Sequence, residues 1–227
     1  ARALHITVIP EIEMPGHSEE VLATYPQLAC SGKPYVNKDL CIGNEETFEF
    51  LKNVLSEVIE LFPSEYIHIG GDEADKASWA TCPRCRTRMR QEGLEDVDGL
   101  QSYLVHRVEV FLNGKGRRLL GWDEILQGGL APDATVMSWR GSEGGIAAFV
   151  TLEKAYSLDP APDSLGVDVV PMILGVQGNL WCEHVPTGEH AEHMIWPRLM
   201  AIAEVGWSLP ERKDYDDFHA RVLDAVA

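Results

Sequence analysis

Five stretches of this 227-residue chain have the pattern of a short buried strand, and polar or aromatic side chains follow each of them. Helix-like segments with one apolar stripe separate several of these strands, so strands and helices alternate along the chain. Alternation of this type predicts a parallel sheet with covering helices. The predicted strands cover residues 4–10, 66–69, 118–125, 135–141 and 173–181, and the predicted helices cover residues 47–62, 100–112, 144–150 and 193–208.

The position of the polar residues favours one kind of α/β fold. A (β/α)8 barrel builds its active site at the C-terminal ends of its strands. A doubly wound open sheet also binds ligands at that edge, but usually in a single crevice. Five polar strand ends therefore favour an α/β fold of the TIM-barrel type. The sequence has no glycine-rich phosphate-binding loop with the right flanks, which weakens a nucleotide-binding interpretation.

The most informative strand end is Tyr-Ile-His-Ile-Gly-Gly-Asp-Glu at residues 66–73. Two glycines at the end of a strand let another group approach the backbone closely. The adjacent acids Asp72 and Glu73 repel each other, so one of them should keep its proton to a higher pH than a free carboxyl group. A protonated carboxyl beside an ionised one can cleave a glycosidic bond. The alternative interpretation is a solvated acidic loop after a strand.

Composition and charge exclude several classes of partner. Hydrophobic residues make up 45% and charged residues 24% of the chain, as in ordinary soluble globular proteins. The net charge of −17 argues against nucleic acid or an anionic membrane surface as a partner. No apolar run is long enough to span a membrane. The chain opens at Ala1 without an initiator methionine, so we expect further residues upstream.

Cysteines form one motif and one looser pair. Cys82-Pro-Arg-Cys85 has the C-x-x-C spacing, which fits half a zinc site, a redox pair or a local disulfide. A four-cysteine zinc site needs a second pair, and we expect none in this sequence; the context is also not thioredoxin-like. A local structural role is therefore favoured over metal. Cys30 and Cys41 flank an irregular loop, and a disulfide between them is expected if the protein is exported.

Five sequence blocks together resemble one enzyme family. They read Pro-Glu-Ile-Glu-Met-Pro-Gly-His at 10–17, His-Ile-Gly-Gly-Asp-Glu at 68–73, Gly-Trp-Asp-Glu at 121–124, Ser-Trp-Arg-Gly at 138–141 and Gln-Gly-Asn-Leu-Trp-Cys-Glu at 177–183. In content and order, these blocks resemble the catalytic domain of family 20 β-N-acetylhexosaminidases. The resemblance extends from the first residue to Trp207.

The resemblance implies a retaining, substrate-assisted glycosidase in which the 2-acetamido carbonyl of the substrate is the nucleophile. Glu73 matches the general acid/base, and Asp72 matches the carboxylate that orients the acetamido group. The implied substrate is a terminal, β-linked N-acetylglucosamine or N-acetylgalactosamine of an oligosaccharide or glycan, and no metal or organic cofactor is implied. Further matched positions are Trp122, Trp139 and Trp181 as pocket walls, Glu183 as an acceptor for sugar hydroxyls, His17 near the general acid, and Glu13, where the family usually has aspartate.

Some of these residues have a purely structural alternative. Each tryptophan could simply belong to a core. Asp123 and Glu124 are explained equally well by a salt bridge or a loop hydrogen bond, and we expect His68 to pack inside the barrel. The Glu45-Glu46 pair and residues 95–98 are interpreted as solvated faces or helix caps.

The chain also departs from the family pattern. Residues 1–227 are expected to form one partial catalytic domain, because the first two barrel strands, with an arginine that holds sugar hydroxyls, have no counterpart. A later strand and loop, which carry a tyrosine and an aspartate, are missing between Ala148 and Leu152. The chain could be a fragment, pair with another copy that covers the open edges, or close on fewer strands. The rival function is a vestigial or carbohydrate-binding homologue with little catalysis.

Overall fold

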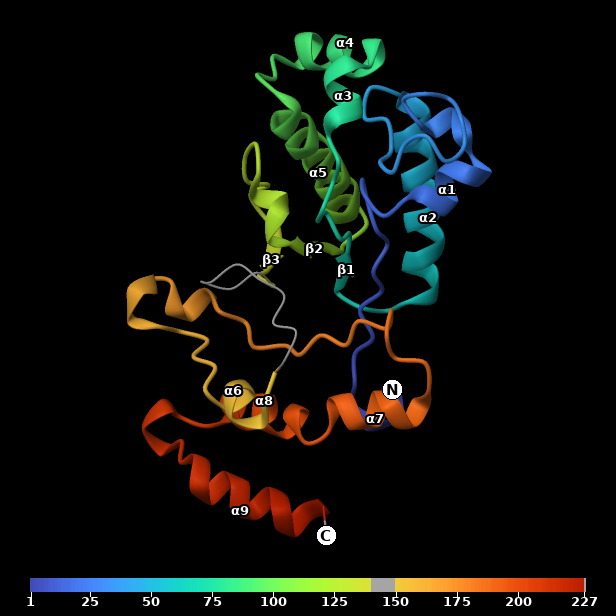
Figure 1. Ribbon diagram of the computed structural model, residues 1–227. Helices are drawn as coiled ribbons and strands as arrows, with labels where there is room; N and C mark the ends of the chain where they lie inside the picture. Colours follow the sequence, from blue (N-terminus) through green and yellow to red (C-terminus); the bar gives the residue numbers. More distant parts are fainter. Residues whose placement is uncertain (140–149, 227) are drawn as a thin grey trace. The chain divides into compact units, whose positions relative to one another are not determined.

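The computed structural model describes residues 1–139 and 150–226 (Figure 1). The chain divides into two compact units, Ala1–Gly145 and Ile146–Ala227. The first unit holds the sheet and its covering helices, and the second consists of helices and irregular segments. Each unit has its own cluster of buried apolar side chains.

The sheet of the first unit is parallel, as predicted. Its strands are β1 (Tyr66–His68), β2 (Arg118–Trp122) and β3 (Thr135–Met137), in the order β1-β2-β3. Ile67 pairs with Leu119, and Leu120 pairs with Thr135. Three predicted strands are thus confirmed with shorter bounds, and all three run in the same direction, so their C-terminal ends share one edge of the sheet.

The predicted strand over residues 4–10 is wrong. Arg2–Leu4 forms the 3-10 helix η1, and Ile6 is 58% exposed. Regular pairing with β1 begins only at Pro10, whose carbonyl oxygen accepts from the His68 amide at 2.9 Å, while the Ile12 amide donates to the His68 carbonyl at 2.9 Å. A β-branched stretch becomes a strand only where a neighbouring strand satisfies its backbone groups.

Two long helices cover the sheet, and both were predicted. Helix α2 covers Glu45–Leu61 and helix α5 covers Val97–Gly114. The side chain of Asn44 caps α2 by accepting from the Glu46 amide, and Asp96 caps α5 by accepting from the Gly99 amide. The shorter helices α1 (Glu19–Thr24), η2 (Pro26–Leu28), α3 (Ala77–Thr81), α4 (Pro83–Glu92) and η3 (Asp123–Leu126) were not predicted.

The core of the first unit lies between these helices and the sheet. Leu51 and Leu55 of α2, Leu104 of α5, Ile67 of β1 and Leu119 of β2 are all at most 2% exposed. Complete burial of each such side chain contributes about 1.5–3 kcal/mol to the free energy of unfolding. This core fixes the strands, and therefore the loops that follow them.

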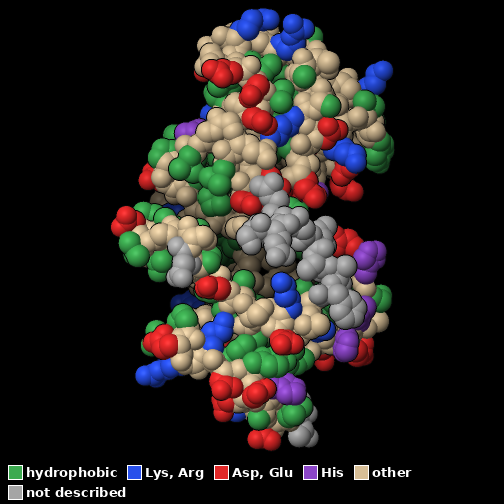
Figure 2. Space-filling model, turned by 60° about the vertical axis from the view of Figure 1, so that its left-hand side comes forward, with side chains coloured by type: hydrophobic (Ala, Val, Ile, Leu, Met, Phe, Trp, Pro, Cys, Tyr) green, Lys and Arg blue, Asp and Glu red, His purple; other side chains and the backbone are tan. Residues whose placement is uncertain are grey.

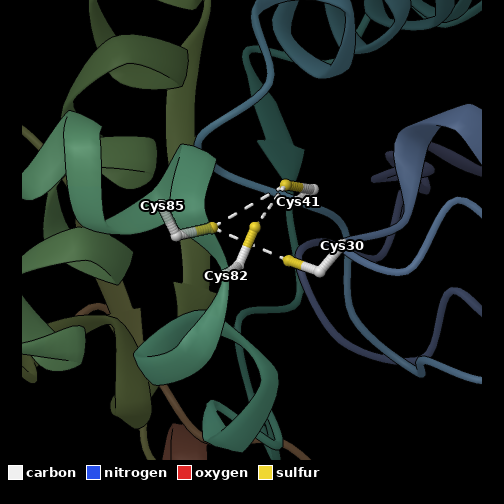
Figure 3. A group of neighbouring side chains, drawn as sticks. All are labelled: Cys30, Cys41, Cys82 and Cys85. Carbon is white, nitrogen blue, oxygen red and sulfur yellow. Dashed lines mark hydrogen bonds between the residues drawn. The ribbon is translucent and has the colours of Figure 1, made fainter.

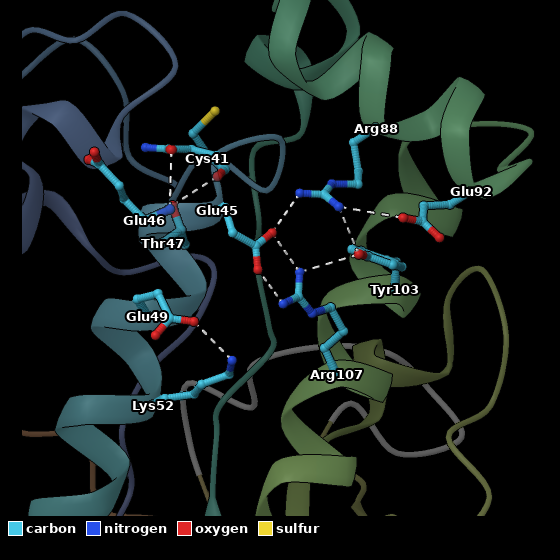
Figure 4. Close-up of polar contacts among 11 residues, drawn as sticks. Cys41, Glu45, Glu46, Thr47, Glu49, Lys52, Arg88, Glu92, Tyr103 and Arg107 are labelled. Atoms are coloured by element: carbon cyan, nitrogen blue, oxygen red, sulfur yellow. Dashed lines mark hydrogen bonds and ion pairs between the residues drawn. The ribbon is translucent and has the colours of Figure 1, made fainter.

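A carboxylate at the start of α2 joins three helices (Figure 4). Glu45 binds Arg107 of α5 at 2.5 Å and Arg88 of α4 at 2.7 Å. These arginines lower the pKa of Glu45 to about 2, with the Arg107 hydrogen bond as the largest cause. The Arg107 guanidinium also lies 3.7 Å from the centre of the Phe48 ring. Glu45 is thus more than the solvated or capping residue that the sequence indicates.

The second unit contains helices α6 (Leu152–Tyr156), α7 (Gly188–Ile195), α8 (Arg198–Trp207) and α9 (Tyr215–Val226), with 3-10 helices η4 (Asp163–Leu165), η5 (Val170–Met172) and η6 (Pro210–Arg212). Its core includes Tyr156, Ala201 and Phe218. The predicted helix over residues 193–208 is two helices, because Pro197 interrupts the pattern.

The predicted strand over residues 173–181 is also wrong, since this segment is irregular and residues 150–226 contain no strand to pair with it. The predicted short helix over residues 144–150 falls almost wholly outside the described residues.

The surface reflects the acidic composition of the chain. Figure 2 shows Asp and Glu side chains spread over the visible face of the molecule. The sequence has 36 acidic residues against 19 Lys and Arg. None of the helices in the described ranges is both long enough and apolar enough to cross a membrane.

Candidate active site

The segment after β1 makes a sharp turn that presents two carboxylates. Gly70 and Gly71 have φ angles of 66° and 96°, and Glu73 has a φ of 49°. Glycine adopts positive φ at little cost, whereas a glutamate in this region is strained. Strained residues of this kind cluster at functional sites, so the geometry points to Glu73 as a residue held in place for a reason other than stability.

An imidazole lies between the two acids. His17 Nε2 is 3.6 Å from Asp72 Oδ2 and 3.4 Å from Glu73 Oε2. The Asp72 side chain is 13% exposed, whereas that of Glu73 is 54% exposed. His17 itself has a φ of 47°. The predicted site residues His17, Asp72 and Glu73 therefore do come together, although they derive from two segments more than fifty positions apart.

Glu13 lies behind this cluster and is the acid whose proton is held most tightly. Burial raises its pKa to about 9, and the negative charge of Asp72 adds to the shift. The Gly71 amide donates a hydrogen bond to Glu13 Oε1 at 3.0 Å. Sequence reasoning sought a protonated acid within the adjacent pair and missed this one. No local pattern in the sequence indicates it, because it results from the close approach of residues 10–14 to β1 in the fold.

The Asp72 carboxylate interacts with the Glu13 side chain, and one of its oxygens has no hydrogen-bond partner of normal geometry. Its Oδ1 atom is buried and has no hydrogen-bond partner among the described residues. A buried acceptor without a partner costs free energy, typically about 1–3 kcal/mol, so such atoms usually have a binding or catalytic reason. Asp72 can therefore accept a hydrogen bond from a bound molecule.

A buried acid, Asp39, supports the loops that carry the site. Asp39 Oδ1 accepts from the Asp75 amide at 3.2 Å, just beyond Glu73. Its neighbour Leu40 donates to the Pro15 carbonyl at 2.9 Å, close to His17. Burial raises the pKa of Asp39 to about 6. No pattern in the sequence indicated Asp39, because its segment is irregular and lacks periodicity.

Two predicted pocket tryptophans follow the neighbouring strands, and their indole N–H groups bind carboxylates. Trp122, at the end of β2, is 4% exposed and donates to Glu11 Oε1 at 2.9 Å. Trp139, two residues beyond β3, donates to Glu124 Oε2 at 3.0 Å. Glu124 thus makes the loop hydrogen bond that the sequence left as one alternative. Glu11 was not among the predicted site residues.

His68 packs inside the first unit, as expected. It is 4% exposed, its ring centre lies 4.7 Å from that of Trp122, and its Nδ1 atom accepts from the Gly70 amide at 3.0 Å. Burial lowers the pKa of His68, and the nearby Glu11 and Asp72 carboxyl groups oppose that shift. Glu11 Oε1 lies 3.1 Å from the same nitrogen.

Two predicted site residues are not part of the first unit. Trp181 and Glu183 belong to the second unit, where both are exposed, Trp181 by 52%. The arginine of the Ser-Trp-Arg-Gly block, at position 140, lies outside the described residues. The first unit therefore brings together Glu13, His17, Asp72 and Glu73, and holds Trp122 and Trp139 at the adjacent strand ends.

Two groups of side chains in the described ranges have donor atoms spaced closely enough to hold a metal ion. One is His17 with Asp72 and Glu73, and the other is Cys30, Cys41, Cys82 and Cys85, each group with its atoms within 4.8 Å of one another. The first group is exposed at two of its members. The second is largely buried.

The chain matches the family model described as glycosyl hydrolase family 20, catalytic domain, over residues 1–148 and 142–210. A β-hexosaminidase of Porphyromonas gingivalis is 42% identical over 262 aligned positions, which include 97% of this chain and 34% of that protein. The 262 positions exceed the 227 residues of the chain, so the relative has positions without a counterpart here.

Solved structures match over the same range. A chitobiase of Flavobacterium johnsoniae superposes with a TM-score of 0.87 at 28% identity, covering 96% of this chain and 38% of that one. An exo-β-N-acetylglucosaminidase of Vibrio harveyi, solved in complex with N-acetylglucosamine, has a TM-score of 0.82 at 28% identity, covering 96% and 42%. The chain thus spans between a third and a half of the length of these relatives.

Proposed function

Because this chain belongs to glycosyl hydrolase family 20, we propose that it hydrolyses terminal β-linked N-acetylglucosamine or N-acetylgalactosamine from oligosaccharides or glycans, with retention of configuration. The observation that carries the proposal is the convergence of Asp72 and Glu73 on one imidazole, that of His17, at the end of β1. The relatives named β-hexosaminidase and the neighbour solved with N-acetylglucosamine support this class of substrate.

Glu73 is the proposed general acid/base. In the first step the acetamido oxygen of the substrate attacks the anomeric carbon, the glycosidic bond breaks, and Glu73 gives its proton to the leaving oxygen. In the second step Glu73 takes a proton from the water that attacks the same carbon, and the cyclic oxazolinium intermediate opens. The 54% exposure of the Glu73 side chain supports this role, because the group must reach both substrate and water.

Asp72 is proposed to orient the acetamido group and to stabilise its developing positive charge. The buried Oδ1 atom without a partner suits an acceptor for the acetamido N–H. The pKa of about 9 at Glu13 leaves that neighbour neutral at pH 7. Asp72 is the proposed source of negative charge beside the intermediate, because a fixed charge in a partly dry site is an effective form of transition-state stabilisation.

His17 is proposed as a positioning residue, because its Nε2 atom lies within reach of both carboxylates. Trp122 and Trp139 are proposed as walls of the sugar pocket, since aromatic faces suit the C–H-rich side of a pyranose. Their bonds to Glu11 and Glu124 would fix the orientation of the two rings. Trp181 as a third wall and Glu183 as a hydroxyl acceptor rest on the family resemblance alone.

The fold is of the TIM-barrel type found in this family, and we propose that residues 1–227 supply part of one catalytic barrel domain. The first two strands and one later strand are the parts proposed to be missing. Two observations support a missing internal part. The family model matches in two overlapping stretches, and the Porphyromonas gingivalis relative has aligned positions without a counterpart in this chain. Pairing with a second copy would cover the open strand edges.

The test is to measure whether the wild-type chain releases nitrophenol from p-nitrophenyl β-N-acetylglucosaminide and from the matched β-glucoside, which lacks the acetamido group. We expect cleavage of the first and negligible cleavage of the second. Equal rates on both would contradict substrate assistance. Binding of N-acetylglucosamine in a calorimeter without cleavage of either glycoside would favour the carbohydrate-binding alternative.

A further inference from the structure

Four of the five cysteines converge on one point, although they come from distant parts of the sequence. The Sγ atoms of Cys30, Cys41, Cys82 and Cys85 all lie within 4.8 Å of one another. Figure 3 shows the four side chains directed toward a common centre. Cys41, Cys82 and Cys85 are buried, and Cys30 is half-buried. The fifth cysteine, Cys182, is exposed in the second unit.

The spacing of the sulfur atoms fits a tetrahedral metal site. Three separations are 3.7 Å (Cys30 to Cys85), 3.7 Å (Cys41 to Cys85) and 3.9 Å (Cys41 to Cys82). With Zn–S bonds of about 2.3 Å, the edges of a regular tetrahedron of sulfurs are about 3.8 Å. A disulfide would bring two of the sulfurs to about 2.05 Å, and all five cysteines are free.

The second cysteine pair that the sequence lacked is supplied by the fold. Ala29 and Leu40 form an antiparallel bridge, and Cys30 and Cys41 each follow one member of it. The Cys41 amide donates to the Leu28 carbonyl at 2.8 Å, which holds the two arms together. The expectation that no second pair exists is therefore wrong, because it considered only the C-x-x-C spacing. The structure also has no disulfide between Cys30 and Cys41.

The other pair lies at the N-terminus of α4, where Cys82 is the N-cap and Pro83 is the first residue. The partial positive charge of a ten-residue helix at this end stabilises thiolates. Arg84, between the two cysteines, interacts electrostatically with Cys41 and Cys82 and donates to the Ala29 carbonyl at 2.7 Å. A cation beside the cluster offsets the charge of −2 that four thiolates and one Zn²⁺ carry together.

Gly43 lets the two cysteine-bearing segments meet. A Cβ atom at this position would lie 2.2 Å from the carbonyl carbon of Arg84 and 2.2 Å from the amide nitrogen of Cys85. These are backbone atoms that cannot move aside easily, so only glycine fits. Close contact between a turn and the start of a helix is what brings Cys41 within reach of Cys85.

We propose that Cys30, Cys41, Cys82 and Cys85 bind one Zn²⁺ ion as a closed structural site. Four protein ligands leave no position for water or substrate, which distinguishes structural from catalytic zinc. The ion ties the irregular loop that follows η2 to the N-terminus of α4. The same loop holds Asp39 against Asp75 and Leu40 against Pro15, so the site also steadies the segments that carry His17 and Glu73. This inference replaces the sequence-based preference for a role without metal.

The experiment measures bound metal in the full chain, purified without chelator, by inductively coupled plasma mass spectrometry. The variants Cys85→Ser and Cys182→Ser are measured beside the wild type. We expect one zinc per wild-type chain, one per Cys182→Ser chain, and loss of the metal in Cys85→Ser. Removal of zinc with a chelator should lower the melting temperature of the wild type, because the ion binds only the folded chain.

A second measurement tests metal binding by the four cysteines even if Cys85→Ser does not fold. The reduced, zinc-free wild type is titrated with Co²⁺, and the absorption spectrum is recorded. Intense visible bands with thiolate-to-cobalt charge transfer in the near ultraviolet are the expected signature of a tetrahedral sulfur site. The proposal is overturned if the reduced wild type binds neither zinc nor cobalt stoichiometrically, or if the native protein contains disulfides among these four cysteines.

Discussion

The carboxyl group of Glu13 occupies the space that a side chain at position 70 would need. A Cβ atom built on Gly70 would lie 1.8 Å from Glu13 Oε1. Glu13 in turn accepts a hydrogen bond from the Gly71 amide and lies beside Asp72, so Gly70, Glu13 and the acid pair form one unit. Gly70 thus leaves room for the carboxyl group of Glu13 and also serves the turn.

Substitution of Gly70 by alanine should therefore cost more than backbone strain alone. Gly93, which ends α4, is the matched control, because its φ of 68° is close to the 66° of Gly70 and nothing lies within 4 Å of its Cβ position. We expect Gly93→Ala to lower the free energy of unfolding by about 1–2 kcal/mol. Gly70→Ala should lower it further and also reduce turnover, as measured by denaturant unfolding and nitrophenol release. Equal costs for the two variants would contradict the packing argument.

The pKa of about 9 at Glu13 predicts how stability depends on pH. Between the unfolded pKa of about 4.5 and the folded value, the native state holds a proton that the unfolded state has lost. The free energy of unfolding therefore falls as pH rises through this window, by at most about 1.4 kcal/mol per pH unit. Glu13→Gln should show a flatter profile in denaturant unfolding from pH 5 to 9. Parallel profiles for the two proteins would show that Glu13 does not titrate in this way.

Asp72→Asn should reduce turnover with little effect on the fold. The amide keeps the shape of the side chain but removes the charge proposed to stabilise the oxazolinium intermediate. Loss of one electrostatic contact of this kind typically lowers kcat about 10²–10³-fold. We expect that loss for p-nitrophenyl β-N-acetylglucosaminide, with an unchanged circular dichroism spectrum. Wild-type kcat in the folded variant would remove Asp72 from the mechanism.

Glu45 should matter for stability, in contrast to a nearby surface pair (Figure 4). Glu45 joins α2 to Arg88 and Arg107, whereas Glu49 meets only Lys52 of its own helix among the contacts drawn there. Glu45 is half exposed, so solvent screening limits its contribution. We expect Glu45→Gln to lower the free energy of unfolding by about 1 kcal/mol, and Glu49→Gln by about 0.5 kcal/mol or less. A smaller effect at Glu45 than at Glu49 would argue against a three-helix clamp.

The sequence predicted best where local pattern and tertiary packing agree. Helices α2 and α5 have clear apolar stripes. The stretch that becomes β1 is followed by glycines and acids, which are residue types that a hydrophobic core does not require. Helix α4 was missed because its first turns carry arginines in place of an apolar stripe. Residues 4–10 have strand composition but find no partner before Pro10, and composition alone does not reveal a missing partner.

Contacts between segments that are far apart in the chain could not be predicted from the sequence. Glu13 meets Gly71 across 58 positions, and Cys41 meets Cys85 across 44. Neither pair has a periodic spacing in the sequence from which the contact could be predicted. Asp72 and Glu73 could be predicted as candidate site residues, because they are adjacent in the sequence and follow a strand that ends in two glycines. The raised pKa values of the half-buried Glu13 and the buried Asp39 come from burial, which only the fold determines.

The most direct test of the proposed function is kcat for hydrolysis of chitobiose, an unactivated substrate, by the wild type and by Glu73→Gln. Glu57→Gln, an exposed position on α2, is the control. General acid/base catalysis by Glu73 predicts a loss of about 10²–10⁴-fold in Glu73→Gln, with N-acetylglucosamine binding retained and Glu57→Gln unchanged. Hydrolysis by Glu73→Gln at the wild-type rate would contradict the assignment of Glu73, and with it the mechanism proposed for this chain.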